Sequence, residues 1–408
     1  MSESEATADP VDTVETVRLP VVVVAGLHAA RRRQVVLELL DGCVDAVVLH
    51  HDLRDAADGI VHRRIRDSEG EFASTVVPLT NDCPCCALRE DLLPELLRIA
   101  ELGQHGLAIV ELWGACDPHP AVELIAEGEV DGRRLGEAIE LAGVVTAVDP
   151  AHLVADLSVP DELRAHGLQT CVQDVRTRAE ALAHQIEYAG VLAVTRAGVE
   201  GGDAPLRRTA LAMLRQLHPT ARTVRLGTGE LIRAALAGFD VPAARDRVNP
   251  ALALLPQERD EAGVATVVWE RRRPLHPARL YEALTRLVPA AQRSRGRFWL
   301  ANRPEQLLAW DAAGASLAVE ECGPWLTSLS DAAWELYPPS RRAAAALDWH
   351  PLHGDRVQQL AFTAAGLDAE GIVRLLDSCL LTDAELVGGE SGWKAMTDAF
   401  AGLLDPVP

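Results

Sequence analysis

The sequence predicts an α/β protein, with a doubly wound parallel sheet followed by a smaller α+β domain. Three observations support this fold class. Short apolar, β-branched runs alternate with helix-like periodicity through residues 17–240, which is typical of parallel strands buried on both faces. Residues 241–262 hold three prolines and four acidic residues, which is typical of a linker. Beyond residue 262 the composition changes, since seven of the eight tryptophans lie there.

Local patterns give the elements of the first domain. Residues 1–16 are acidic and predict a solvated tail. Periodicity of 3.6 residues predicts helices at 31–40 and 88–102. Residues 63–78 alternate around Ser68-Glu69-Gly70, which predicts a hairpin. The strands predicted from apolar runs are 17–26, 44–50, 107–112, 143–148, 190–194 and 222–226.

The second domain, residues 263–408, mixes short strands with two amphipathic helices, as α+β domains do. Its predicted helices are 276–287 and 369–380. Its predicted strands are 264–270, 296–301, 316–320 and 358–362.

Charge and composition exclude several classes of protein. The 408 residues include 39 Lys and Arg against 60 Asp and Glu, a formal net charge of −21, so the whole chain is not a basic nucleic-acid-binding protein. The one lysine is Lys394, which excludes lysine chemistry elsewhere. We find no membrane-spanning apolar run and no secretory signal. Eight cysteines are too few for a disulfide scaffold, and we expect a cytoplasmic protein in a reduced compartment.

The strand and helix around Gly26 have the architecture of a phosphate-binding loop. A working P-loop has the sequence GxxxxGK[ST], in which the lysine meets phosphate and the hydroxyl holds Mg²⁺. Counted from Gly26, Arg31 replaces the second glycine, Arg32 the lysine and Arg33 the hydroxyl. Arg32 could still bind phosphate, but Arg33 would repel Mg²⁺. Two interpretations stay open: an ordinary strand–helix turn with a basic face, or a residual nucleotide site.

Three thiols lie within four residues, at Cys83, Cys85 and Cys86, just before an amphipathic helix. A helix N-terminus favours thiolates, and closely spaced thiolates select Zn²⁺ or Cu⁺. Zinc normally takes four ligands, so His50 or His51, at the end of a predicted strand, is a candidate for the fourth. The alternatives are three small buried residues at a helix start and an ordinary surface histidine.

Motifs beyond the cysteine cluster follow one another in a fixed order. The cluster continues as Ala87-Leu88-Arg89-Glu90-Asp91-Leu92-Leu93, and further motifs are Glu111–Pro118, Val144–Asp149, Gln185–Ala189, 272–280, 295–304 and Gly354-Asp355-Arg356. Together these residues resemble the CobW-like branch of the G3E family of P-loop GTPases. The resemblance implies a P-loop-type domain over residues 17–240 and a CobW C-terminal domain over residues 263–408.

Departures from the family pattern indicate a degenerate nucleotide site. By resemblance, Gly26, Arg32, Arg33 and Gly114 would form that site, and Glu111 would lie near Mg²⁺ or water. The family's guanine-reading Asn-Lys-x-Asp is replaced by Thr195-Arg196-Ala197-Gly198. Because phosphate grip, Mg²⁺ ligand and base reader all differ, we predict a pseudo-GTPase in which Glu111 forms ion pairs, with Arg32 as one partner. No catalytic residue is assigned; zinc is the expected cofactor, and GTP with Mg²⁺ is not.

One subgroup of the family is especially similar, the actinobacterial CobW-like proteins of zinc limitation, which recruit a ribosome hibernation factor to the ribosome. The resemblance implies a recruiter in which Cys83, Cys85, Cys86 and His51 bind zinc and bias the arrangement of the two domains. Two other hypotheses remain: a zinc metallochaperone that hydrolyses GTP, and a zinc reservoir or sensor.

A basic segment offers a surface for such a partner. Residues 270–303 hold nine arginines and two acidic residues, and phosphate contacts need only a local stripe. Phe298 and Trp299 could stack on bases of ribosomal RNA. Alternatively the arginines cover one face of a small sheet and Trp299 is core. The arginines proposed for RNA contact are Arg271, Arg272, Arg273, Arg293, Arg295 and Arg297.

Overall fold

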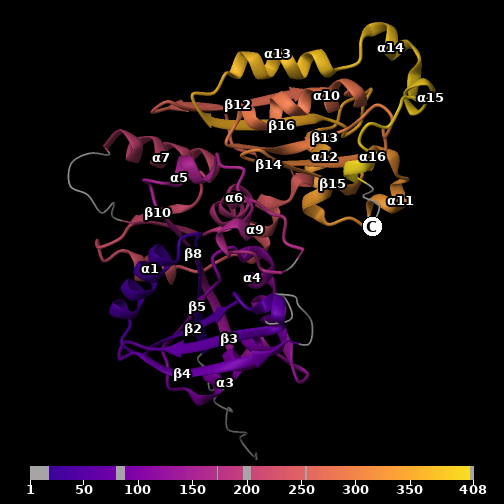
Figure 1. Cartoon of the computed structure of the whole chain (residues 1–408). Helices are drawn as coiled ribbons and strands as arrows, with labels where there is room; N and C mark the ends of the chain where they lie inside the picture. Colours follow the sequence, from indigo (N-terminus) through magenta and orange to yellow (C-terminus); the bar gives the residue numbers. More distant parts are fainter. Residues whose placement is uncertain (1–17, 80–87, 172, 196–203, 253–254, 405–408) are drawn as a thin grey trace, which may run out of the picture.

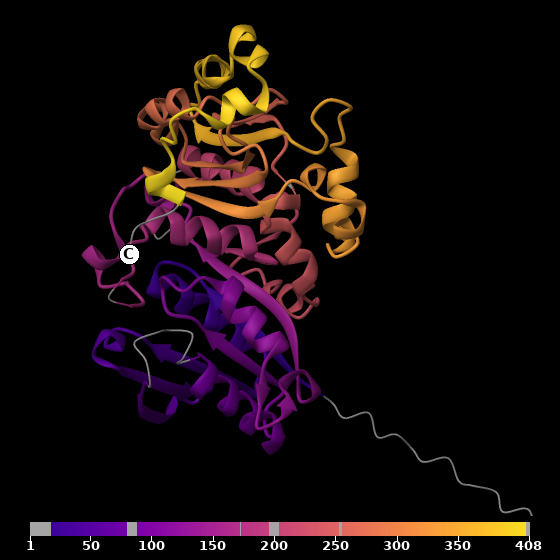
Figure 2. The same ribbon diagram turned by 90° about the vertical axis from the view of Figure 1, so that its right-hand side faces the viewer.

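The structure is a computed structural model that describes residues 18–79, 88–171, 173–195, 204–252 and 255–404. Two domains lie one above the other in Figure 1, and the turned view of Figure 2 shows the same stacking. The fold class predicted from the sequence is confirmed. In the described residues no helix is long and apolar enough to cross a membrane.

The first domain is built on an eight-stranded sheet with the order β10-β9-β8-β1-β5-β2-β3-β4. The six strands from β10 to β2 run parallel, and β3 and β4 add an antiparallel hairpin at one edge. The strands are β1 (Leu19–Ala25), β2 (Ala46–Asp52), β3 (Ile60–Arg66), β4 (Glu71–Pro78), β5 (Leu107–Glu111), β8 (Ile139–Val148), β9 (Val191–Val194) and β10 (Arg222–Arg225).

Helices cover both faces of this sheet, which explains the unbroken valine run of β1. Val21 and Val23 pack on the side of α3 and α4, whereas Val22 and Val24 pack on the side of α1 and α8. The helices are α1 (Ala29–Gly42), α3 (Leu93–Leu102), α4 (Pro118–Glu127), α5 (Leu153–Asp156), α6 (Arg178–Tyr188), α7 (Ala204–Leu217), α8 (Leu231–Ala235) and α9 (Val241–Val248). A π-helical turn, η2 (Leu88–Leu92), precedes α3, and β6 (Glu129–Val130) pairs with β7 (Arg133–Arg134).

The second domain is a six-stranded antiparallel sheet with the order β11-β12-β16-β13-β14-β15. Helices α10 and α13 cover one face, and α6 and α7 of the first domain contact the other, as Figure 1 shows. The strands are β11 (Arg259–Glu261), β12 (Val264–Arg271), β13 (Arg293–Phe298), β14 (Gln306–Ala313), β15 (Ser316–Pro324) and β16 (Gln358–Ala365). The helices are α10 (Pro277–Leu287), α11 (Asp331–Trp334), α12 (Pro339–Leu347), α13 (Ala369–Cys379), α14 (Asp383–Val387), α15 (Gly389–Lys394) and α16 (Ala401–Leu404).

Several segments differ from the sequence expectation, and three of them are informative. The region 241–262 contains helix α9, because the Asp240 carboxylate accepts a hydrogen bond from the Ala243 N–H and the helix packs on α4 and α6. Strand β13 begins at Arg293 rather than at residue 296. Strand β14 was not indicated by any pattern, because it is buried on both faces and its apolar residues do not alternate.

Candidate functional site

The turn after β1 brings the chain very close to β8. Gly26 has φ +139°, and a Cβ there would lie 2.7 Å from the carbonyl oxygen of Ala147, so only glycine fits. Helix α1 begins immediately after His28, its N-terminal cap residue. This strand–turn–helix is the place that a phosphate occupies in P-loop proteins.

The side chain of Arg32 fills this turn from inside. It is 3% exposed, and its Nη1 donates hydrogen bonds to the carbonyl oxygens of Gly26 at 2.6 Å and Leu27 at 3.3 Å. Its Nε lies 3.7 Å from Oε1 of Glu111, at the end of β5. Burial lowers the pKa of Arg32, and the charge of Glu111 opposes that shift. A phosphate-binding loop presents N–H groups, whereas here two carbonyl oxygens point at a guanidinium.

Glu111 and Gly114 complete the surroundings of Arg32. Arg66 of β3 donates a second charged hydrogen bond to Glu111, 2.8 Å from Nη2 to Oε2. A Cβ at Gly114 would lie 3.2 Å from Nη1 of Arg32 and 3.0 Å from the Leu27 carbonyl oxygen. The sequence-predicted residues Gly26, Arg32, Glu111 and Gly114 are therefore brought together, and the expected ion pair between Glu111 and Arg32 is present.

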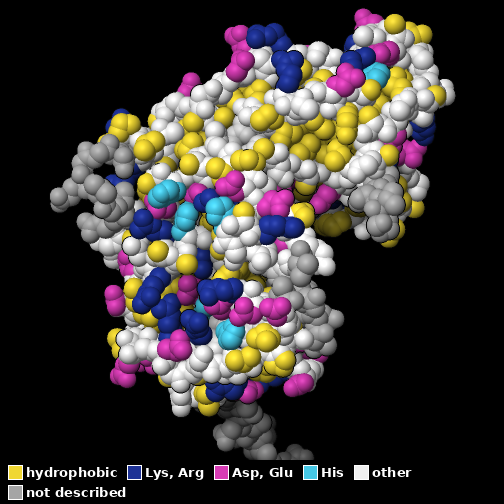
Figure 3. Space-filling model, viewed as in Figure 1, with side chains coloured by type: hydrophobic (Ala, Val, Ile, Leu, Met, Phe, Trp, Pro, Cys, Tyr) yellow, Lys and Arg dark blue, Asp and Glu magenta, His cyan; other side chains and the backbone are white. Residues whose placement is uncertain are grey.

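A second layer of ion pairs lies outside Arg32. Nε of Arg31 is 2.7 Å from Asp149, and Nε2 of His28 is 2.6 Å from Asp156. Burial raises the pKa of Asp149, but hydrogen bonds from the Ala151 N–H, His152 and Arg31 hold it below its usual value. Arg33 is exposed and joins neither layer. Figure 3 shows basic, acidic and histidine side chains interspersed over this face of the first domain.

His51, the proposed metal ligand, is paired with a carboxylate. Its Nε2 lies 2.7 Å from Oδ2 of Asp91, whose other oxygen accepts a hydrogen bond from Arg63 at 2.7 Å. Asp91 belongs to η2, directly after the cysteine motif. The other candidate, His50, has its Nδ1 2.9 Å from the backbone oxygen of Glu111.

The thiol part of the predicted metal site cannot be placed. Cys83, Cys85 and Cys86 lie outside the described residues. Within those residues, no group of three or more His, Cys, Asp or Glu side chains is arranged to hold a metal ion.

The expectation that Arg293, Arg295 and Arg297 contact RNA is wrong, because all three lie on the inner face of β13. Arg293 and Arg297 are 3% and 2% exposed, and the Arg295 side chain is 12% exposed. Phe298 and Trp299 are fully buried, so Trp299 is core and base stacking is excluded.

The other three arginines proposed for RNA contact are partly exposed and ion-paired. Arg271 lies 2.9 Å from Asp377, and Arg273 lies 2.8 Å from Asp383. Arg272 donates a hydrogen bond to the backbone oxygen of Asp348 at 2.6 Å. Their charges are therefore largely neutralised within the second domain.

Two family models match separate segments of the chain. They are the CobW/HypB/UreG nucleotide-binding domain, over residues 29–225, and the cobalamin synthesis protein cobW C-terminal domain, over residues 264–380. The chain is also 32% identical over 398 residues to the zinc chaperone Rv0106 of Mycobacterium tuberculosis, covering 94% of this chain and 93% of that protein. The chain belongs to the CobW family.

Two further CobW relatives are more distant. The zinc-regulated GTPase metalloprotein activator 1 of Dictyostelium discoideum is 27% identical over 79% of this chain and 70% of its own length. The zinc chaperone CobW of Pseudomonas aeruginosa is 24% identical over 55% of this chain and 61% of its own length.

A charged cluster between the two domains of this CobW protein was not predicted from the sequence. Arg293 bonds Glu187 of α6 at 2.7 and 2.8 Å and also pairs with Asp311 of β14. Nε2 of His184 lies 3.2 Å from Asp311, and Nδ1 lies 3.5 Å from Asp117. The one available signal was the spacing of Arg293, Arg295 and Arg297, which places them on one face of a strand.

Proposed function

We propose that this protein is a zinc-linked pseudo-GTPase of the CobW family that recruits a ribosome hibernation factor to the ribosome under zinc limitation. The observation that carries the proposal is Arg32, which takes the lysine position of the P-loop and turns back into it. A triphosphate would have to displace a buried guanidinium that holds two carbonyl oxygens and Glu111.

The proposed zinc ligands are the cysteine motif and His51. In metal sites a ligating histidine commonly donates its other N–H to a carboxylate, which fixes the ring. The contact between Nε2 of His51 and Asp91 fits this role and leaves Nδ1 for a metal. Zinc would link the thiolates before η2 to the end of β2. The relatives named zinc chaperones support the involvement of zinc.

Nucleotide binding is the deciding experiment. We would titrate GTP, with ATP as control, into the protein with Mg²⁺, with and without zinc, by calorimetry. We expect no binding up to millimolar nucleotide. The variant Arg31→Gly/Arg32→Lys/Arg33→Ser restores the GxxxxGK[ST] pattern and should bind triphosphates without guanine preference. The matched variant Arg33→Ser keeps Arg32 and should still not bind.

Recruitment is tested by co-sedimentation of ribosomes with a hibernation factor at low and high zinc. Changing Cys83, Cys85 and Cys86 to Ser should make recruitment insensitive to zinc, whereas Cys43→Ser, outside the motif, should leave the zinc response intact. Equal recruitment by wild type and the triple variant at both zinc levels would remove the zinc-controlled recruiter from consideration.

The second candidate is a zinc metallochaperone that hydrolyses GTP. The name of the Dictyostelium relative, a zinc-regulated GTPase metalloprotein activator, favours it. Micromolar, GTP-selective binding by the wild-type protein would make this second candidate the better one.

A further inference from the structure

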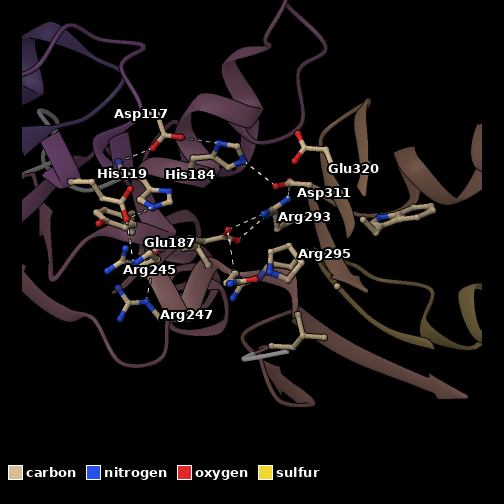
Figure 4. Close-up of a pocket in the computed structure, with 18 residues that line it drawn as sticks. Asp117, His119, His184, Glu187, Arg245, Arg247, Arg293, Arg295, Asp311 and Glu320 are labelled. Atoms are coloured by element: carbon tan, nitrogen blue, oxygen red, sulfur yellow. Dashed lines mark hydrogen bonds and ion pairs between the residues drawn. The ribbon is translucent and has the colours of Figure 1, made fainter. Parts of the chain in front are cut away.

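A cavity of about 440 Å³ lies between the two domains, away from the degenerate nucleotide site. Its walls come from α4, α6 and α9 of the first domain and from β13, β14 and β15 of the second, and Figure 4 shows their side chains converging on it. This volume is within the range of about 300–1,000 Å³ that is typical of small-molecule sites. Nothing in the proposed function uses this cavity.

Most charges around the cavity are already neutralised. Glu187 is paired with Arg293 and Arg295, and His184 bridges Asp117 and Asp311. A further chain of ion pairs runs from His119 to Glu123 at 3.2 Å and from Glu123 to Arg245 at 3.4 Å. Glu320 is exposed and lies on the opposite side of the cavity from Arg245 and Arg247 (Figure 4).

Among the hydrogen-bond donors that line the cavity, one on Arg247 and one on Tyr188 have no acceptor. Arg247 donates from Nε to the backbone oxygen of Glu187 at 3.2 Å, but its Nη2 is buried without a partner. No carboxylate of the described residues lies within ion-pair distance of Arg247. The hydroxyl of Tyr188 is also buried without a partner, on a side chain that is 1% exposed. A buried donor without an acceptor is unfavourable, so these two donors indicate a missing acceptor.

The positions of these donors favour an anion over a neutral acceptor. Burial and the nearby charge of Arg295 lower the pKa of Arg247 despite the opposing charge of Glu187, so an anion beside its guanidinium would offset this unfavourable environment. Burial, together with the charges of Glu123 and Asp117, raises the pKa of Tyr188, which therefore keeps its proton as a donor. Val248, Pro250, Leu255 and Trp310 supply the apolar part of the cavity wall.

We propose that this cavity binds a small organic anion, with its phosphate or carboxylate between Arg247 and Tyr188 and its apolar part against Trp310. Such a ligand touches α6 and α9 on one side and the second sheet on the other. Binding would therefore stabilise the two domains in the arrangement seen here.

Phenyl phosphate and benzoate are the probes, because each joins an aromatic ring to one of the two candidate anions. Inorganic phosphate and benzyl alcohol separate the contributions of charge and ring. We would follow the fluorescence of tryptophan, since Trp310 lines the cavity, and the thermal melting temperature. One of the two aromatic anions should bind in the micromolar to low millimolar range and raise the melting temperature, with benzyl alcohol far weaker.

Two variants separate a binding role from a structural one. Arg247→Gln should lower the affinity for the anion about tenfold or more, because it removes a charged hydrogen bond. Its matched control, Arg208→Gln, changes an exposed arginine of α7 and should bind normally. Tyr188→Phe should weaken binding yet leave the ligand-free protein as stable as wild type or more stable, since an unpaired hydroxyl is removed. Equal binding by wild type and Arg247→Gln, or no binding of either aromatic anion, would overturn the proposal.

Discussion

The side chain of Arg32 occupies the turn in which a P-loop protein would hold a phosphate. A buried guanidinium is stable only where its charge and its N–H groups are matched. Here Glu111 supplies the charge and the turn supplies two carbonyl oxygens. Arg66 holds Glu111 from the other side, so the carboxylate lies between two arginines of different elements. The turn is thus built around its own cation.

Changing Arg32→Met tests this role. The variant leaves two carbonyl oxygens without their donor and Glu111 with Arg66 alone. We expect a loss of about 3 kcal/mol in the free energy of unfolding, measured by urea denaturation, because breaking a buried ion pair has costs of this size. Arg33→Met, at an exposed neighbour, should change it by less than about 0.5 kcal/mol. Equal stability of the two variants would show that the Arg32 contacts are not structural.

The same scale explains what the sequence could and could not predict. The ion pair between Arg32 and Glu111 was predictable from the family pattern. In that pattern the position of Arg32 holds the phosphate-binding lysine and Glu111 lies near Mg²⁺ or water, and neither role is retained here. The burial of Arg293 was not predictable. A strand pattern shows which residues share a face of the sheet, but it does not show what covers that face. Glu187, its partner, lies 106 residues earlier in the chain.

Helix α6 is one of the elements that join the two domains. Neighbouring side chains of this helix contact different domains. Gln185 donates hydrogen bonds to the carbonyl oxygens of Gly114 and Cys116 in the first domain. His184 and Glu187 contact the second domain. The helix is fixed at its start by a capping box formed by Thr177 and Glu180. A shift of α6 would therefore change contacts both next to the degenerate nucleotide site and at the domain interface.

The charge of His184 predicts how this interface responds to pH. Burial lowers the pKa of His184, but Asp117 and Asp311 more than offset that effect and raise it to about 10. Unfolded histidine titrates near pH 6.5, so the stabilisation is complete below about pH 6.5 and is lost as the pH rises toward about 10.

We expect the free energy of unfolding to fall over that alkaline range in the wild type and to fall less in His184→Gln. Denaturation curves collected at several pH values would measure the difference. The control, His166→Gln, changes a surface histidine paired with Asp161 and should keep the wild-type slope. Identical slopes for wild type and His184→Gln would mean that His184 is not charged in the folded protein.

At the scale of the whole molecule, the two domains form one packed body. Val264 and Ala313 of the second domain belong to the apolar cluster formed by α5, α6 and α7 of the first. The turn after β14 fits closely there, since a Cβ at Gly314 would lie 3.1 Å from the Cβ of Ala179. Gln216 of α7 donates to the backbone oxygen of Val264 and accepts from Thr266. These contacts predict a single cooperative unfolding transition.

We expect the single unfolding transition to depend on the charge of Glu187. Its carboxylate is buried against the equally buried Arg293, and Gln at this position keeps the shape but removes the charge that Arg293 and Arg295 require. We expect Glu187→Gln to lose about 3 kcal/mol. In calorimetry, the second domain should then melt as a separate transition, because the interface would lose its buried charge pair and keep the apolar contacts, the Gln216 hydrogen bonds and the His184–Asp311 ion pair. Glu101→Gln removes an exposed ion pair with Arg133 and should cost less than about 1 kcal/mol while keeping one transition. A single, unshifted transition in Glu187→Gln would mean that these remaining contacts hold the domains together, and the ion pairs of Glu187 would then serve to orient α6 rather than to stabilise the interface.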